Sequence, residues 1–229
     1  MDKKKGKLKK IIFGIVGTII LFIIVVIVNL IIFEKRASVV SKGQPIENYK
    51  GSNCALLVVD IQEATTGEVS TNPFYSMNSD SLIKNINRIT DTFKNRDFLV
   101  VYIRSEISDP LIKLLNNSFA KGSLGAKFDK RMKFDSGLEV IKSRNDAFID
   151  TELDRILTGN RISELYLVGL DAAYCINITS EAAQNRNYTV KLIDEAILSE
   201  SETMKDSMMV DFKERGIKII SIDSINIMK

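Results

Sequence analysis

The sequence predicts an α/β fold: a doubly wound, mostly parallel sheet with helices on both faces, preceded by one N-terminal transmembrane helix. Short continuous apolar runs, such as Cys54 to Val59 and Leu165 to Val168, are typical of strands buried on both faces. Helical patterns separate these runs, and strand–helix–strand alternation favours parallel pairing with right-handed crossovers. The run from Ile11 to Phe33 is apolar over about 23 residues, enough to cross a hydrocarbon core of about 30 Å.

The lysines before the apolar run indicate the orientation of the chain. Residues 1–10 hold six lysines against one acid, whereas residues 34–36 carry nearly balanced charge. By the positive-inside rule, we expect residues 1–10 to form a cytoplasmic tail and residues 11–33 a single-pass span in the cell membrane. Residues 34–52 would form a linker and residues 53–229 an extracytoplasmic domain. A cleaved signal peptide is the rival interpretation, but its apolar region has about 7 to 15 residues and this run is longer.

Composition limits the classes of function. The formal net charge is +3, but the lysine-rich tail accounts for it and leaves the domain at about −3, so nucleic acid is not an expected partner. Histidine is absent, which excludes His-based catalytic triads and His-ligated zinc. The two cysteines, Cys54 and Cys175, are too few for a disulfide scaffold. A bridge between them is the alternative to free thiols, and it would silence Cys175.

The expected elements of the domain alternate along the chain. The segment from 104 to 136 shows no hydrophobic periodicity beyond a short helical stretch at 110–118. We expect it to form a lid over the active site or an addition at the edge of the sheet, because loops carry specificity on such scaffolds. The other expected elements are a strand at 54–59, a loop at 65–79, a helix at 81–95, a strand at 98–103, a short apolar segment at 138–142, a helix at 151–157, a strand at 165–168, a helix from Cys175, a strand at 189–193, a helix at 200–215 and a strand at 217–222.

Three chemically active residues, Asp60, Lys142 and Cys175, stand at expected strand ends, where ligands bind in open α/β sheets. Cys175 falls in the first turn of a helix, where free N–H groups and the helix dipole favour a thiolate. A cysteine nucleophile needs a proton acceptor and a stabilising cation, and without histidine an aspartate and a lysine remain for these tasks. The structural alternatives are a buried cysteine, a helix-capping aspartate and a solvated surface lysine.

Three stretches that contain these residues resemble the isochorismatase-like cysteine hydrolase superfamily. They are ALLVVDIQ (55–62), VIKSRNDAFIDTELDRIL (140–157) and LYLVGLDAAYCINITSEAAQNRNYTVKLIDEAILS (165–199), in the order of the family's motifs. The resemblance implies that the strands bearing Asp60 and Cys175 are neighbours at the switch point of a doubly wound sheet. It also implies a catalytic triad.

In that triad, the resemblance makes Cys175 the nucleophile, Asp60 its base, and Lys142 the cation that holds the thiolate and the developing oxyanion. It further implies a cis peptide between Leu170 and Asp171. The backbone N–H groups of Asp171 and Cys175 would then form the oxyanion hole. Gln62 is the candidate substrate contact.

The sequence departs from the family pattern in its lack of histidine and at Asp171, and these departures affect the expected metal site and the expected thiolate. Nicotinamidase members bind a metal through histidines, and this chain has none, so we expect no metal and no cofactor. Asp171 replaces a commoner small residue, and its charge would oppose thiolate formation if the side chain faced the site. Isochorismatase itself does not use a cysteine nucleophile, so Cys175 indicates the amidase branch.

The leading hypothesis is a membrane-anchored cysteine hydrolase that cleaves an amide, or a related C–N or ester bond, of a small molecule through a thioester on Cys175. The alternative is a catalytically inactive isochorismatase-like domain that binds a ligand or partner at the cell surface. A thiol redox protein is a third hypothesis, but the chain has no C-x-x-C motif. No motif identifies the substrate. Homo-oligomers are common among relatives, so a homo-oligomer is an open expectation.

Overall fold

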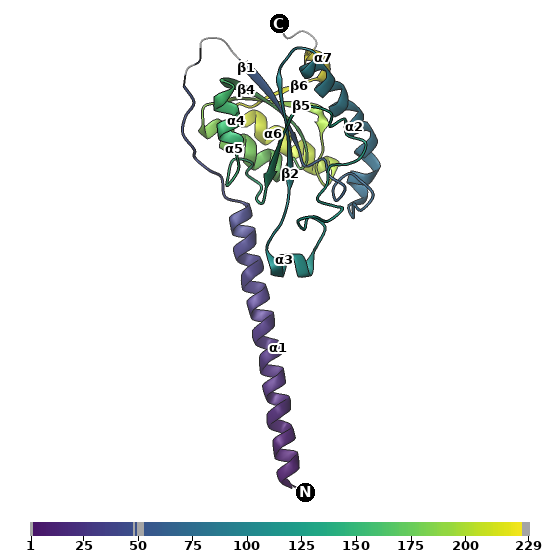
Figure 1. The fold of residues 1–229 in the computed structure, drawn as a ribbon, viewed down its shortest axis with the longest axis vertical. Coiled ribbons are helices and arrows are strands. Elements are labelled where there is room, and N and C mark those ends of the chain that lie inside the picture. Colours follow the sequence, from purple (N-terminus) through teal and green to yellow (C-terminus); the bar gives the residue numbers. More distant parts are fainter. Residues whose placement is uncertain (1, 48, 50–52, 226–229) are drawn as a thin grey trace.

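The computed structural model describes residues 2–47, 49 and 53–225, in which an open sheet carries helices on both faces and one long helix leads away from it (Figure 1). Residues 48 and 50–52 of the expected linker, and 226–229 of the expected domain, lie outside the described residues. The strand order is β3-β2-β1-β4-β5-β6, and all pairings of neighbouring strands in the described part are parallel, which confirms the predicted fold class. The strands are β1 (Asn53–Val59), β2 (Leu99–Ser105), β3 (Leu138–Lys142), β4 (Ile162–Gly169), β5 (Thr189–Ile197) and β6 (Lys218–Ile220).

The helices agree with the sequence pattern except near residue 73 and at the C-terminal end. The expected loop at 65–79 is wrong from Pro73 onward, because the Asn72 side chain caps a helix that begins there and accepts from the Phe74 N–H at 2.9 Å. A short helix after β6 was not expected. The helices are α1 (Asp2–Ala37), α2 (Pro73–Lys94), α3 (Pro110–Leu115), α4 (Leu153–Gly159), α5 (Cys175–Asn185), α6 (Glu202–Glu214) and α7 (Ile222–Ile225).

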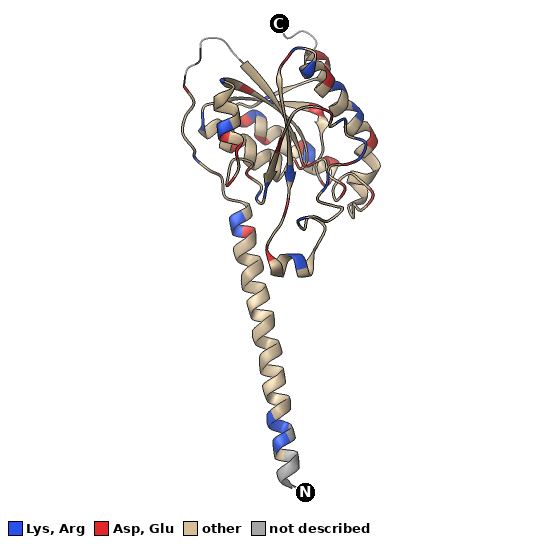
Figure 2. Cartoon of the chain, viewed as in Figure 1, with Lys and Arg blue, Asp and Glu red and all other residues tan. Residues whose placement is uncertain are grey.

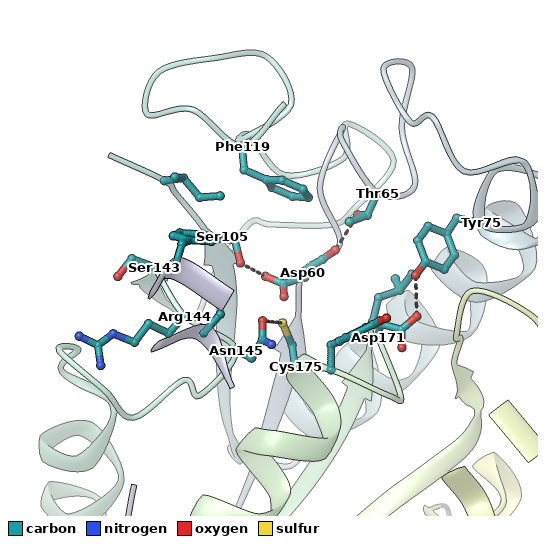
Figure 3. A pocket seen from close by; sticks show the side chains of 15 residues that line it. Asp60, Thr65, Tyr75, Ser105, Phe119, Ser143, Arg144, Asn145, Asp171 and Cys175 are labelled. Atoms are coloured by element: carbon teal, nitrogen blue, oxygen red, sulfur yellow. Dashed lines mark hydrogen bonds between the residues drawn. The ribbon is translucent and has the colours of Figure 1, made fainter. Parts of the chain in front are cut away.

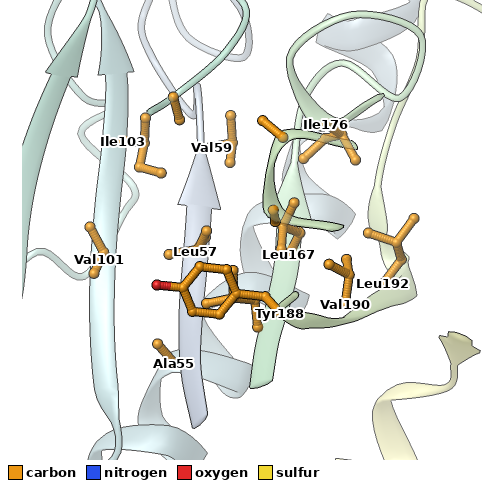
Figure 4. Packing of buried hydrophobic residues seen from close by; sticks show 14 of the residues in the cluster. Ala55, Leu57, Val59, Val101, Ile103, Leu167, Ile176, Tyr188, Val190 and Leu192 are labelled. Carbon is orange, nitrogen blue, oxygen red and sulfur yellow. The ribbon is translucent and has the colours of Figure 1, made fainter. Parts of the chain in front are cut away.

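Each face of the sheet packs against its own helices. On one face, strand residues such as Leu57 and Leu167 pack with Ile176 of α5 and with residues of α4 and α6, and Figure 4 shows part of this layer. On the other face, strand residues pack against α2 and α7, where Ile86 and Phe93 are fully buried. Burying one such side chain contributes about 1.5–3 kcal/mol. Burial on both faces explains why the strands are unbroken apolar runs.

The winding direction reverses between β1 and β4, which lie side by side at the centre of the sheet. Gly169 ends β4 with φ of +116°, and a Cβ atom built on it would lie 2.0 Å from the Val59 carbonyl oxygen. The next residue, Leu170, donates its N–H to the same oxygen at 3.0 Å. Only glycine allows this close approach, which places the residues that follow the two strands at one switch point.

The long helix α1 is fixed to the domain at its C-terminal end. Its part from Lys9 to Ala37 is long and apolar enough to cross a membrane, although a signal sequence can also meet these two criteria of length and composition. Figure 2 shows basic residues near the N-terminus and near residue 36, with uncharged residues between them. The Ala37 carbonyl oxygen accepts from the Asn145 N–H at 3.2 Å, and the Ser41 N–H donates to Asp146 Oδ2 at 2.7 Å. The domain is therefore held against the end of this helix.

Candidate active site

Asp60 follows β1 directly and is held by the neighbouring strand. Its backbone has φ of +54°, a left-handed conformation that is costly for a residue other than glycine and is most often retained at functional sites. Its N–H donates to the Ile103 carbonyl at 2.8 Å. Its carboxylate accepts from Ser105 Oγ at 2.9 Å and from Lys142 Nζ at 2.8 Å. The aspartate is thus buried and anchored by residues of β2 and β3.

Lys142, the last residue of β3, is almost completely buried, with 1% of its side chain exposed. Besides Asp60, its Nζ atom donates to Ser105 Oγ at 2.7 Å and to Cys175 Sγ at 3.1 Å. These three acceptors use all three protons of the ammonium group. The cation therefore lies between the carboxylate and the sulfur and bonds to both.

Cys175 is the first residue of α5, as expected, and its Sγ atom lies 3.5 Å from Asn145 Oδ1 (Figure 3). Both cysteines are free thiols, and Cys54 is buried within β1, so the alternative of a bridge between them is not found. The three residues predicted from strand ends are thus brought together by β1, β3 and the start of α5.

Burial and the neighbouring carboxylate favour the thiol form of Cys175 over the thiolate. Burial, followed by the negative charge of Asp60, raises the pKa of Cys175 to about 12, and the opposing effect of Lys142 is smaller. Burial beside a carboxylate thus opposes the effect expected of the helix N-terminus, which favours a thiolate. Burial alone would lower the pKa of Lys142, but Asp60 and Cys175 outweigh burial and raise it, so the lysine stays protonated.

The peptide bond between Leu170 and Asp171 is cis, as the family resemblance implied. The Asp171 carboxylate accepts from the Tyr75 hydroxyl at 2.5 Å, from Ser199 Oγ at 2.8 Å and from the Ala173 N–H at 2.6 Å. Figure 3 shows it paired with Tyr75. Burial, together with this hydrogen bond, raises the pKa of Tyr75, which keeps the hydroxyl a donor. The charge that was expected to oppose a thiolate is therefore satisfied by three donors.

Gln62 does not line the pocket, contrary to the expectation of a substrate contact. Its side chain is fully buried, and Nε2 donates to the carbonyls of Ser105 and Ala126 at 3.0 and 2.9 Å. Its Oε1 atom accepts from the Ser105 N–H at 2.8 Å. All of these contacts are with backbone groups. Gln62 therefore positions the end of β2, and with it the Ser105 hydroxyl that bonds to Asp60 and Lys142.

A pocket of about 290 Å³ opens onto Asp60 and Cys175. Sequence reasoning missed Ser105 and Asn145, although each had a signal: Ser105 ends the strand beside β1, and Asn145 lies three residues after Lys142. Figure 3 shows how the labelled side chains surround the pocket. Its other lining residues are mostly apolar or aromatic, with a few polar side chains: Phe33, Ala37, Thr65, Tyr75, Ile107, Phe119, Ser143, Arg144, Leu170, Asp171 and Tyr174.

Two of these residues, Phe33 and Ala37, belong to the last turns of α1. Asn145 connects them to the site, because its N–H donates to the Ala37 carbonyl and its side chain contacts Cys175. The sequence had indicated only an anchor in this helix. The structure shows that its end is also a wall of the pocket.

A sequence profile of the isochorismatase domain matches residues 54–224, almost the whole region beyond α1 and the linker. The chain belongs to the isochorismatase family. This confirms the resemblance drawn from the strand-end motifs, and the match spans all six strands of the sheet.

Several known proteins are similar to this chain. N-carbamoylsarcosine amidase from Arthrobacter sp. is 29% identical over 146 residues, which are 58% of this chain and 54% of the amidase. A probable inactive nicotinamidase from Arabidopsis thaliana is 24% identical over 180 residues, covering 72% of this chain and 91% of that protein. The crystal structure of an isochorismatase-like hydrolase from Alkaliphilus metalliredigens superposes with a TM-score of 0.66 at 22% identity, covering 76% of this chain and 98% of that one. The chain is thus an isochorismatase-family hydrolase by family and fold.

The histidine-ligated metal site of nicotinamidase members does not fit this isochorismatase-family chain. Histidine is absent from the sequence. Among the residues that the structure describes, no three Cys, Asp or Glu side chains are grouped so that they could hold a metal ion. The chemistry available at the pocket is therefore that of Asp60, Lys142, Ser105 and Cys175.

Proposed function

We propose that the protein is a membrane-anchored cysteine hydrolase that cleaves an amide, or a related C–N or ester bond, of a small molecule through a thioester on Cys175. The observation that carries this proposal is the position of Lys142 Nζ, 2.8 Å from Asp60 Oδ2 and 3.1 Å from Cys175 Sγ, two residues that line a pocket. A nucleophile, a proton acceptor and a cation within hydrogen-bond reach meet the geometric requirement for covalent catalysis.

In the first half of the reaction, Cys175 Sγ attacks the carbonyl carbon. Because the pKa of this thiol is raised to about 12, little thiolate exists at neutral pH, so the proton passes to Asp60 as the sulfur attacks. Lys142 remains beside both groups and offsets the negative charge that leaves the carboxylate and appears on the intermediate. The tetrahedral intermediate then collapses, the C–N bond breaks, and Asp60 returns the proton to the leaving amine.

In the second half, water hydrolyses the thioester. Asp60, again a carboxylate, accepts a proton from the water as the water oxygen attacks the thioester carbonyl carbon. The C–S bond then breaks, Asp60 gives the proton that it accepted from the water to the sulfur, and a carboxylic acid leaves. The net reaction adds one water to one amide and restores the thiol.

The oxyanion of both intermediates would be bound by the backbone N–H groups of Asp171 and Cys175. Support comes from the position of Cys175 at the first residue of α5, where backbone N–H groups have no partner within the helix. Donors at a helix N-terminus also carry the positive end of the helix dipole. Removing one such donor from an enzyme typically lowers kcat about 10²- to 10³-fold.

Anchoring by α1 is supported by the composition of the pocket wall. Cleavage of α1 as a signal peptide near Ala37 would remove Phe33 from the wall and would cut the chain where it bonds to Asn145. The lysines before the span favour a cytoplasmic N-terminus. Membrane fractions washed with alkaline carbonate should retain the full-length chain, and protease added to intact cells should digest only the domain.

The proposed chemistry is tested by the purified full chain in detergent, supplied with a panel of amides, N-carbamoyl compounds and esters. Release of amine or acid should fall at least about 10³-fold in Cys175→Ala. Intact-protein mass spectrometry of acid-quenched samples should show an acyl adduct on the native chain that hydroxylamine removes. Turnover that persists in Cys175→Ala would rule out the thioester.

A binding module without catalysis is the second candidate function, and two observations favour it. The raised pKa of Cys175 disfavours the reactive thiolate, and one relative is described as a probable inactive nicotinamidase. In that case the whole panel should show no turnover and no adduct. Ligand or partner binding would then be unchanged in Cys175→Ala.

A further inference from the structure

One face of α1 leads from α3 to the pocket. Val26, Asn29, Phe33 and Ala37 are less exposed than the residues around them, and their spacing of three or four places them on one side of the helix. Asn29 Nδ2 lies 3.5 Å from Oδ2 of Asp109, the N-cap residue of α3, while Phe33 and Ala37 line the pocket. This face therefore contacts the domain over its last three turns.

The contact with α3 lies inside the apolar part of α1. Asn29 is four residues before Phe33, the end of the uncharged run, which corresponds to about 6 Å along the helix. A span at residues 11–33 would therefore place α3 beside the boundary between hydrocarbon and headgroups. Figure 1 shows α3 projecting from the domain next to α1, away from the sheet.

The surface of α3 suits that position. Leu114 and Leu115 are 70% and 54% exposed, and Lys113 is also exposed. Exposed leucines with a nearby lysine are typical of helices that lie in a membrane interface. Because α3 contacts the apolar part of α1, lipid is the occupant that fits this apolar surface.

The pocket combines a polar base with apolar walls from this same region. Asp60 and Cys175 line its polar base, and the buried Lys142 bonds to both. Ile107 and Phe119 come from the two ends of the segment that carries α3. Figure 3 shows Phe119 across the pocket from Cys175. Together with Phe33 of α1, Ile107 and Phe119 form an apolar wall of the pocket.

We propose that the pocket receives its substrate from the membrane, and that the substrate is an amphipathic amide with a long aliphatic chain. This inference rests on the proposed hydrolase function and assigns its substrate class. The amide group lies at Cys175, and the chain passes Phe33, Ile107 and Phe119 toward the lipid beside α3. Burial of each CH₂ group of the substrate contributes about 0.8 kcal/mol to its binding, so the apolar wall favours substrates with a longer aliphatic chain.

Contact of α3 with lipid is tested without catalysis, because the chain contains no tryptophan. Leu115→Trp places a single fluorophore on α3, and Val210→Trp places one on α6, where Val210 is 57% exposed and outside the pocket. Each full-length variant is reconstituted into phosphatidylcholine vesicles with brominated acyl chains. Bromine should quench Leu115→Trp strongly and Val210→Trp weakly. Equal quenching of both would overturn the proposal.

Selection for a long aliphatic chain in the substrate is tested with the double variant Cys175→Ala/Phe119→Trp, in an experiment that needs no turnover. Dibromooctadecanamide should quench this tryptophan saturably, and excess hexadecanamide should reverse the quenching while butanamide should not. Cys175→Ala/Leu115→Trp reports amide that is merely dissolved in the bilayer. Quenching that rises without saturation in both variants, or that butanamide reverses equally well, would overturn the proposal.

Turnover of long and short amides by the unmodified protein distinguishes failure of the proposed substrate class from failure of the proposed hydrolase function. We expect kcat/KM at least about tenfold higher for hexadecanamide than for butanamide. Equal kcat/KM for the two amides contradicts the inference and leaves the hydrolase standing. Saturable binding of the long amide without any turnover contradicts the hydrolase, while the membrane-derived ligand stands.

Discussion

Lys142 Nζ lies 2.8 Å from Asp60 Oδ2, and the two side chains are 1% and 7% exposed. Removing one partner of a buried ion pair leaves an uncompensated charge and costs about 3–5 kcal/mol. We therefore expect Lys142→Met to abolish hydrolysis and to lower the free energy of unfolding by about that amount. Denaturant unfolding followed by tyrosine fluorescence, beside an activity assay, measures both effects.

The matched control for that prediction is the double variant Asp60→Asn/Lys142→Met. It removes both charges, so it should recover much of the lost stability while remaining inactive. A Lys142→Met protein as stable as the original would contradict the buried pair. A double variant as active as the original would contradict the assigned roles.

The pH dependence of thiol alkylation follows from the electrostatics of the site. With the pKa of Cys175 raised to about 12, the thiolate fraction, and hence the alkylation rate, should rise about tenfold per pH unit from pH 7 to pH 10 without a plateau. Asp60→Asn removes the negative charge that raises this pKa, so it should increase the rate at a fixed pH. Lys142→Met removes the opposing charge and should decrease it.

Cys54 provides the internal control. Burial, followed by Glu164, raises its pKa to about 11, and the residue lies within β1 with only 6% exposed. Both thiols have raised pKa values, but Cys175 opens onto the pocket whereas Cys54 is buried in a strand, so peptide mapping after alkylation should find modification at Cys175 and not at Cys54. A rate for Cys175 that levels off near pH 8 would show a prepared thiolate and contradict the raised pKa.

The sheet and the three strand-end residues were predictable because their signals are local. A strand buried on both faces is an unbroken apolar run, so Cys54 to Val59 indicated β1 directly. Parallel strands end at one edge, so residues after different strands, such as Asp60 and Lys142, were expected to meet. The start of α2 was missed because its cap, Asn72, lies within a polar stretch that also reads as a loop.

What the sequence could not predict depends on distances between remote residues. The pocket brings Phe33 of α1 together with Asn145 and Cys175, which lie more than a hundred residues further along the sequence. The hydrophobic periodicity of a sequence does not predict such a contact. The direction of the Cys175 pKa shift depends on burial and on the closeness of Asp60 relative to Lys142. Gln62 was assigned to substrate from its motif, but only the structure shows its side chain bonded to backbone groups.

Ser105 should prove a positioning residue whose loss weakens catalysis without abolishing it. Its Oγ atom accepts from Lys142 at 2.7 Å and donates to Asp60 at 2.9 Å. Ser105→Ala leaves one proton of the buried ammonium without an acceptor, which costs about 1–3 kcal/mol. We expect kcat to fall about tenfold or more with KM little changed, and the alkylation profile of Cys175 to shift. Ser105→Thr should restore much of the rate, and an unchanged profile in Ser105→Ala would contradict this role.

Gly169→Ala should loosen the switch point that sets the spacing of Asp60 and Cys175. The added Cβ would lie 2.0 Å from the Val59 carbonyl oxygen, at a φ of +116° that alanine rarely adopts. We expect the free energy of unfolding to fall by more than about 1 kcal/mol, and each kcal/mol lowers Tm by about 2–4 °C. Activity should also fall, because β1 and β4 move apart. Gly159→Ala is the matched control, since a Cβ there meets no atom within 4 Å. Equal Tm values for the two variants would show that β1 and β4 do not require a glycine where they meet.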